Sequence, residues 1–296
     1  MSETAVIVNP IAGAGRRPDL GRRRAQFARA CLRGRGVAGD VFVTGHAGHA
    51  RELAAAAVGR GVSCCIAWGG DGTVNEVASA LAFTPASLGI VPGGSGNGLS
   101  RELGIPFEAH AAFTIALGGR ERAIDAGEID GRLFFNLAGV GLDARIAHHF
   151  SATGLVRRGF RRYLEIAAAE IFAHAPLEYD ISVDGQVRRS SVLLVAIANG
   201  RQYGNGALIA PAARIDDGKL DVIVVEDRSP WAVIRHIPKL FRGRLAEVPG
   251  VTMTPAAQVC ISGPAPLIYH VDGEPCEGGS SLSARIRPGA LKVRVR

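Results

Sequence analysis

Lysine is nearly absent from this chain of 296 residues, whose three lysines are Lys219, Lys239 and Lys292. The glycine-rich loops in the N-terminal third have no lysine near them, which excludes a P-loop mechanism, because that mechanism needs a lysine to reach the phosphates. Cysteine is also scarce: there are five, an odd number, and no two have C-x-x-C spacing. We therefore expect neither a disulfide framework nor a zinc site, and the composition favours a reducing cytoplasm.

Long apolar runs are missing as well. The longest, residues 192–198, is far shorter than the roughly 18 residues that a membrane-spanning helix needs. The first residues lack the basic and then apolar pattern of a signal peptide, so none is expected. Hydrophobic residues nevertheless make up 47% of the chain, which is enough for a substantial core and excludes disorder as the dominant state.

The net charge is +7 and the isoelectric point about 9.6, so acidic partners such as nucleotides, nucleic acids or anionic lipids fit the composition. Nucleic acid is not expected among them. The basic residues are spread along the chain, aromatic residues make up only 6%, and no nucleic-acid-binding motif is recognisable.

Two patterns divide the chain near residue 122. Residues 1–122 alternate short apolar runs with helical patterns, which predicts an α/β domain with a parallel sheet. Residues 123–296 predict a mostly antiparallel β domain with helices at about 157–174 and 230–242, and a last strand at about 290–295 that packs on either domain. The expected strands of this second part are 121–129, 132–138, 177–183, 187–198, 219–226, 251–261 and 266–271, and Asp184-Gly185 between two of them predicts a hairpin turn.

Three glycine-rich loops each follow a predicted strand of the first domain, at residues 9–15, 69–72 and 92–98. The carboxyl ends of parallel strands meet at one edge of a sheet, so we expect these loops to converge there. Glycines let a backbone approach phosphates closely, and a helix that begins beyond them offers unpaired N–H groups. For the second loop alone, a tight turn before a helix is an equally good interpretation.

The motifs together resemble those of the diacylglycerol kinase and sphingosine kinase superfamily, and bacterial lipid kinases most of all. They are NPIAGAGR at 9–16, GGDGTVNE at 69–76, PGGSGNGLSREL at 92–103, DDGKLD at 216–221 and VDGE at 271–274. The resemblance covers essentially the whole chain, in the right order. It implies a nucleotide-binding α/β domain like that of NAD and diacylglycerol kinases, a C-terminal antiparallel β-sandwich domain, and ATP in a cleft between them. The implied reaction is Mg²⁺-dependent transfer of the γ-phosphate of ATP to the hydroxyl of a diacylglycerol-like or sphingosine-like lipid.

The resemblance also implies roles for particular residues. The nucleotide contacts that it implies are Asn9, Thr44, Gly69, Gly70, Asp71, Gly72, Thr73, Val74, Asn75 and Ser95. Thr44 is almost equally well interpreted as the cap of a helix. Glu274 matches the general base that takes the proton from the lipid hydroxyl, and Asp71 is the rival base. A hairpin turn with an exposed glutamate is the simpler interpretation of residues 272–274.

Two further sites follow from the same resemblance. Asp217, with the backbone carbonyls of Arg214 and Lys219, matches a structural Mg²⁺ site, although an ordinary surface turn would explain the same residues. Asp143 matches a contact to the lipid head, although an acidic residue in the first turn of a helix explains it equally well. Bacterial diacylglycerol kinases usually have aspartate at the position of Gly98, so this departure puts diacylglycerol in doubt more than it does kinase activity.

Three basic stretches, at 18–35, 155–164 and 230–244, alternate arginines with apolar residues in helical spacing. For the first, a helix packed by one face is the favoured interpretation. For the other two, contact with an anionic membrane surface and simple core packing are equally good interpretations. We expect a cytoplasmic protein, peripheral at the inner membrane face if the membrane interpretation holds. A kinase of a soluble polyol or dinucleotide, and a non-catalytic binding protein, remain as alternatives.

Overall fold

A computed structural model describes residues 3–13, 19–152 and 160–296, with the side chains of 160–164 left out. Arg157 and Arg158 of the second basic stretch, and residues 14–16 of the NPIAGAGR motif, lie outside the described residues. The chain forms two compact units: Met1–Ile124 with Gly289–Arg296, and Asp125–Pro288. In the described ranges, no helix is both long and apolar enough to cross a membrane.

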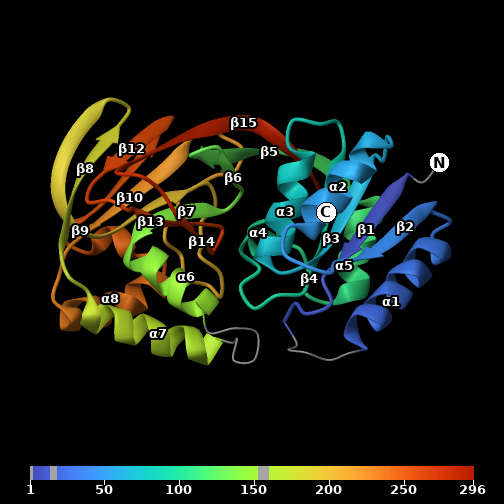
Figure 1. Cartoon of the computed structure of the whole chain (residues 1–296), viewed down its shortest axis with the longest axis horizontal. Helices are drawn as coiled ribbons and strands as arrows, with labels where there is room; N and C mark the ends of the chain where they lie inside the picture. Colours follow the sequence, from blue (N-terminus) through green and yellow to red (C-terminus); the bar gives the residue numbers. More distant parts are fainter. Residues whose placement is uncertain (1–2, 14–18, 153–159) are drawn as a thin grey trace. The chain divides into compact units, whose positions relative to one another are not determined.

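The first unit has a parallel sheet in the order β2-β1-β3-β4, and the end of β15 pairs in parallel with β4 (Figure 1). Its strands are β1 (Thr4–Val8), β2 (Gly39–Val43), β3 (Cys64–Gly69) and β4 (Ser87–Pro92). Its helices are α1 (Leu20–Gly34), α2 (His49–Gly59), α3 (Asp71–Leu81), α4 (Gly98–Glu102) and α5 (Ala109–Gly118).

Burial explains why these strands form an inner layer. Every residue of β1, β3 and β4 is buried, as expected for parallel strands with both faces covered. Helices α1 and α5 pack on one face, where Leu32 and Phe113 meet Ile66 and Trp68. Helices α2 and α3 pack against each other and against β1 and β3 (Figure 1). The exposed arginines of α1 lie opposite its buried stripe, which confirms one-sided packing of the first basic stretch.

The second unit is built from antiparallel strands. The path β14-β13-β7-β9-β8-β12-β15 forms its main sheet, β10 pairs with β9 and β11, and β5 pairs with β6 and β15. The strands are β5 (Arg120–Ile129), β6 (Arg132–Phe134), β7 (Leu137–Gly141), β8 (Leu177–Val183), β9 (Gln186–Ala198), β10 (Leu220–Glu226), β11 (Val251–Ala256), β12 (Gln258–Ser262), β13 (Ile268–Val271), β14 (Glu274–Glu277) and β15 (Ser281–Val295).

Two apolar clusters hold this unit together. Residues such as Val195 and Ile197 of β9 point into a cluster between the β-strands. Their neighbours Ala196 and Ala198 point into a second cluster, which is shared with the helices. This alternation is what a strand covered on both faces requires. The helices are α6 (Leu142–Ala152), α7 (Phe160–Ala173) and α8 (Pro230–Phe241), followed by the 3-10 turn η2 (Leu245–Glu247).

The expected fold class is confirmed, with a few differences in the elements. The apolar runs at 132–138 and 251–261 each form two strands, β6 with β7 and β11 with β12. The last strand begins at Ser281, earlier than expected, and its end from Gly289 belongs to the first unit. Asp184 and Gly185, both with positive φ, form the predicted hairpin turn between β8 and β9.

Candidate active site

The three glycine-rich loops of the first unit meet, as the sequence predicts. Gly70 and Gly94 approach so closely that a Cβ atom built on Gly94 would lie 2.5 Å from the Cα atom of Gly70. Gly13 has φ +76°, and a Cβ atom there would lie 2.2 Å from the carbonyl oxygen of Gly93. Side chains at these positions would force the loops apart, so the glycines are needed for contact between the loops themselves.

Polar residues in the first half of helix α3 hold three neighbouring segments: the first and third glycine-rich loops and the start of α2. The Asp71 carboxylate accepts backbone N–H bonds from Asn97 (2.8 Å) and Gly98 (2.7 Å) in the third loop. The Thr73 hydroxyl accepts a bond from the Asn9 side-chain amide (2.8 Å) in the first loop. Each polar residue of the GGDGT segment therefore has a structural partner in another loop.

Glu76 provides the third anchor, and sequence analysis gave it no role. Its carboxylate accepts the backbone N–H groups of Gly48 (2.9 Å) and Ala50 (3.0 Å), where α2 begins. Helix α2 has Gly48 as its N-cap, so the interpretation of Thr44 as a helix cap is wrong. Thr44 instead lies directly after β2, and its N–H donates to the carbonyl oxygen of Val8 (2.9 Å). This capping is visible only in the structure, because Glu76 lies 26 residues after Ala50 in the helix that it caps.

The N-terminus of α3 has the features of an anion site. Its N-cap is Gly70, whose lack of a side chain leaves the first N–H groups of the helix without a side-chain cap. Ser95 is exposed and Asn75 is half-buried, so both side chains reach the surface. Val74 and Thr73 are buried in the packed face of α3. The Val74 N–H donates to the carbonyl oxygen of Gly70 (3.0 Å), so it is used within the helix, and a nucleotide contact at Val74 stays a prediction.

Arg24 is a cation at this edge of the sheet that sequence analysis missed. Its guanidinium donates to the carbonyl oxygens of Asn9 (2.8 Å) and Ala12 (3.1 Å), and it lies over the Trp68 ring. Burial lowers the pKa of Arg24 from its ordinary value. Its position, directly after Arg22 and Arg23 in α1, gave no sign of this role, because the contact depends on how α1 packs on the sheet.

In the second unit, Asp143 lies in a buried polar network. Its Oδ2 atom accepts a hydrogen bond from the Tyr203 hydroxyl (3.0 Å) and lies 3.3 Å from Nε2 of His270. Nδ1 of His270 accepts the Gly273 N–H (3.3 Å), which leaves Nε2 as the ring nitrogen that donates to Asp143. Asp143 also lies in the first turn of α6, as the simpler interpretation predicted.

His270 connects this network to the turn that carries Glu274. Asp272 and Gly273 have φ values of +47° and +86°, and Val271 pairs with Glu274, which defines a two-residue hairpin turn. The Asp272 carboxylate accepts N–H bonds from Phe135, Asn136 and Leu137, each at 3.0 Å. Asp272 therefore fixes the turn, and the Glu274 side chain is exposed at the start of β14.

The predicted metal segment presents oxygen ligands on the surface. Asp217 is exposed, and its carboxylate accepts the N–H of Lys219 (3.1 Å). The buried Asp125 carboxylate accepts the N–H of Gly218 (2.7 Å) and so supports the same turn. Burial, and then the charge of Asp217, raise the pKa of the Asp221 carboxyl. The donors present are all oxygens, a set that suits a hard cation such as Mg²⁺.

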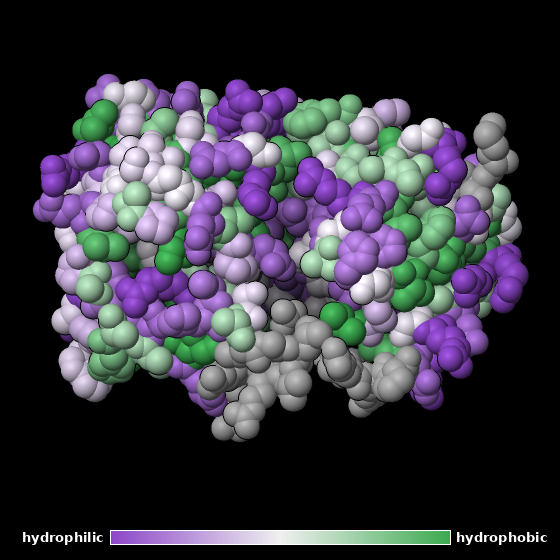
Figure 2. All heavy atoms as spheres, viewed as in Figure 1, coloured by the Kyte–Doolittle hydropathy of each residue, from purple (hydrophilic) through white to green (hydrophobic). Residues whose placement is uncertain are grey.

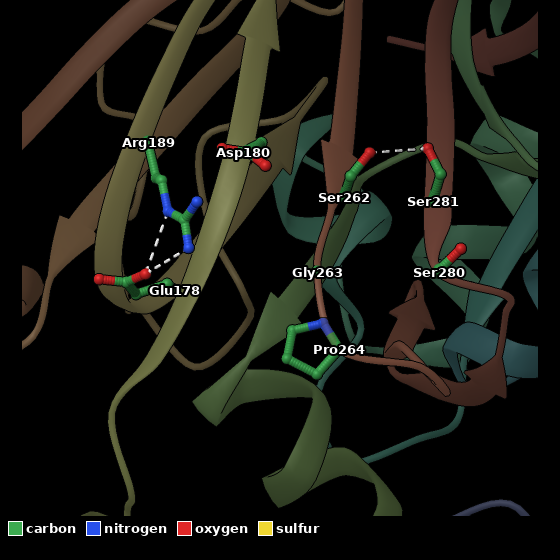
Figure 3. A pocket seen from close by; sticks show the side chains of 8 residues that line it. All are labelled: Glu178, Asp180, Arg189, Ser262, Gly263, Pro264, Ser280 and Ser281. Atoms are coloured by element: carbon green, nitrogen blue, oxygen red, sulfur yellow. Dashed lines mark hydrogen bonds and ion pairs between the residues drawn. The ribbon is translucent and has the colours of Figure 1, made fainter.

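A hollow of about 540 Å³ lies elsewhere in the second unit (Figure 3). Its lining comes from β8, β9, β12 and the start of β15, and it includes the ion pair between Glu178 and Arg189 (2.7 Å) and the Ser262–Ser281 hydrogen bond (3.0 Å). Both members of the ion pair are mostly exposed, so the hollow is open to solvent. None of the predicted site residues lines it.

Comparisons with known proteins agree with this arrangement. Residues 3–129 match the family "Diacylglycerol kinase catalytic domain", and residues 136–295 match "YegS C-terminal NAD kinase beta sandwich-like domain". The Pseudomonas aeruginosa PAO1 protein named "Probable lipid kinase YegS-like" is 33% identical over 287 residues, covering 94% of this chain and 91% of its own. A diacylglycerol kinase of Mycobacterium tuberculosis H37Rv is 32% identical over 300 residues, covering 99% of this chain and 95% of its own.

Solved structures show the same fold. A proposed diacylglycerol kinase from Bacillus anthracis matches with a TM-score of 0.81 at 24% identity, covering 100% of this chain and 95% of that one.

Because both family matches are in order and together span nearly the whole sequence, the chain belongs to the diacylglycerol kinase family of lipid kinases, phosphotransferases that act on an alcohol group.

Proposed function

We propose that this protein uses ATP and Mg²⁺ to phosphorylate the hydroxyl group of a diacylglycerol-like or sphingosine-like lipid. The observation that carries the proposal is the meeting of three glycine-rich loops at the uncapped N-terminus of α3. Phosphates there would be held by backbone N–H groups and the positive end of the helix dipole, with Arg24 as a nearby cation.

The two acidic candidates have different roles in this proposal. Both carboxylate oxygens of Asp71 accept backbone amides, so Asp71 holds the third loop in place and is a poor choice for the base. The exposed Glu274 carboxylate follows a two-residue turn that Asp272 holds in place, and it is available to accept the proton of the attacking hydroxyl. Asp143, with Tyr203 and His270, is the proposed recognition group for the acceptor.

Mg²⁺ would have two places in such an enzyme. Bound with ATP, it would neutralise charge that develops on the transferred phosphoryl group. As a structural ion, it would be held by the Asp217 carboxylate and the carbonyl oxygens of Arg214 and Lys219, whose all-oxygen chemistry fits it. The chain itself supplies the amides that bind phosphate and the carboxylate that takes the proton.

The test is transfer of labelled γ-phosphate from ATP to diacylglycerol, monoacylglycerol, sphingosine, ceramide and phosphatidylglycerol in mixed micelles. Glu274→Gln is compared with Glu277→Gln, which removes another exposed carboxylate of β14. We expect transfer to one lipid, lowered about 100-fold or more by Glu274→Gln, because general-base catalysis contributes about 10²–10⁴-fold. ATP binding should survive both changes, and Glu277→Gln should keep activity within about twofold of the wild type.

Other results would redirect the proposal. Full activity of Glu274→Gln would remove it as the base. ATP binding without transfer to any lipid would indicate a soluble acceptor. A protein that neither binds ATP nor transfers phosphate would support the non-catalytic alternative.

A further inference from the structure

Helix α8 of the second unit carries large apolar side chains that the fold leaves in water. Val233, Ile234 and Leu240 pack against the helical cluster, but no residue of α8 is fully buried. Trp231 is 72% exposed, and Ile237 and Phe241 are exposed as well. Packing of α8 within the monomer does not account for these exposed side chains, and exposed apolar groups that lie together mark interaction sites.

The neighbouring helix α7 extends this surface. Phe172 is 52% exposed, and its ring meets the Trp231 ring edge to face, with centroids 5.3 Å apart. Figure 1 shows the two helices side by side, and Figure 2 shows green side chains among purple ones over them. We call Phe172, Trp231, Ile237 and Phe241 the aromatic edge. The contact between the Phe172 and Trp231 rings joins the two helices at this edge.

The aromatic edge is bordered by positive charge. Residues 228–244 contain five basic residues and no acidic one: Arg228, Arg235, Lys239, Arg242 and Arg244. Lys239 and Arg244 are paired with Glu247. Arg235 and Arg242 are exposed, and neither forms an ion pair with any residue in the described ranges. Partial burial, followed by the charges of Arg235, Lys239 and Arg228, lowers the pKa of His236, which agrees with a cationic surface.

We propose that the aromatic edge and its arginines dock on the surface of an anionic lipid bilayer. Tryptophan is favoured at the boundary between acyl chains and headgroups, and basic side chains beside it attract anionic headgroups. The helices are too short to cross, so the contact is peripheral. This inference rests on the proposed function, because an enzyme whose acceptor is a membrane lipid meets that lipid at a membrane surface. Charge complementarity selects the bilayer over a second copy of this basic chain.

The two tryptophans give a direct assay. Trp68 is 6% exposed and packed against Phe27 and Phe113, whereas Trp231 is exposed. Vesicles of phosphatidylglycerol should shift the Trp231 emission to shorter wavelength, and brominated lipids should quench it, while phosphatidylcholine vesicles should do neither. Trp231→Phe, which keeps an apolar ring at this position, should abolish most of this signal.

Vesicle sedimentation then measures affinity without ATP. Arg235→Gln and Arg242→Gln should each weaken vesicle binding about fivefold, because one basic residue near an anionic surface contributes about 1 kcal/mol. Trp231→Ala should weaken binding about tenfold or more. Val187→Ala is the matched control, because Val187 is 71% exposed in the same unit but lies on the β8–β9 hairpin. It should bind like the wild type.

Unchanged vesicle binding by Trp231→Ala and by the double arginine variant would overturn the docking proposal. So would a dimer in sedimentation velocity that Trp231→Ala dissociates, because the edge would then face a second copy. The proposed function fails separately. If the protein binds vesicles but transfers no phosphate in micelles, the docking proposal stands and the lipid kinase proposal fails. If it transfers phosphate in micelles but does not bind phosphatidylglycerol vesicles, the lipid kinase proposal stands and the docking proposal fails.

Discussion

Replacing Asp71 by asparagine tests the structural role of its carboxylate. In the wild type, one carboxylate accepts two backbone N–H groups, at 2.8 Å from Asn97 and 2.7 Å from Gly98. Asparagine keeps one acceptor oxygen and turns an NH₂ group toward the other amide. A hydrogen bond to a charged group contributes about 1.5–3 kcal/mol, so we expect the third loop to lose about 2 kcal/mol of local stability.

Amide hydrogen exchange at Asn97 and Gly98 is the most direct assay. A loss of about 2 kcal/mol would raise the exchange rate of these amides about 30-fold, since 1.36 kcal/mol corresponds to a factor of ten. Glu76→Gln is the control, because Glu76 makes the same double contact with Gly48 and Ala50. It should speed exchange at those two amides and leave the third loop protected. Unchanged exchange at Asn97 and Gly98 in Asp71→Asn would refute the anchoring role.

Two further perturbations test other contacts. Gly94→Ala would place a Cβ atom 2.5 Å from the Gly70 Cα, so it should cost about 1–3 kcal/mol and weaken ATP binding measured by calorimetry; Gly59→Ala, where the added atom meets nothing, should do neither. Glu128→Gln should destabilise the protein by about 0.5–1 kcal/mol at neutral pH, because hydrogen bonds and charge from Arg285, and then Arg287, lower the pKa of Glu128 in the folded state, while solvent screens this surface pair. That stabilisation is present above the ordinary glutamate pKa and is lost as pH falls through the lowered value, so melting curves of the two proteins should converge in acid and not in base.

The sequence predicted what local patterns encode. The alternation of strands and helices gave the α/β unit, and glycine density after three strands gave the meeting point of their loops. The hairpin turns at Asp184 and Asp272 followed from Asp-Gly pairs between strand-like runs. In each case the physical cause lies within a few neighbouring residues or in the rule that parallel strands end at one edge.

The contacts missed by sequence analysis join residues far apart in the chain. Glu76 caps a helix 26 residues before it, and His270 meets Asp143 across 127 residues. Thr44 was open to a wrong interpretation because a threonine before a helical pattern is a common cap, and the observed cap, Gly48, has no side chain. The exposure of Trp231 was equally hidden, since an amphipathic pattern does not say whether the protein covers the apolar face.

Strand β15 has a consequence for how the protein is made. Its final segment pairs with β4, and the N–H of Phe83 donates to the carbonyl oxygen of Ala290 (2.8 Å), so the last eight residues finish the sheet that residue 4 begins. A ribosome delivers β1 to β4 first and this closing strand about 200 residues later. Until then β4 is a bare edge with unpaired backbone groups, the kind of surface that invites aggregation. The nascent chain therefore has to protect its first unit while the whole second unit is being synthesised.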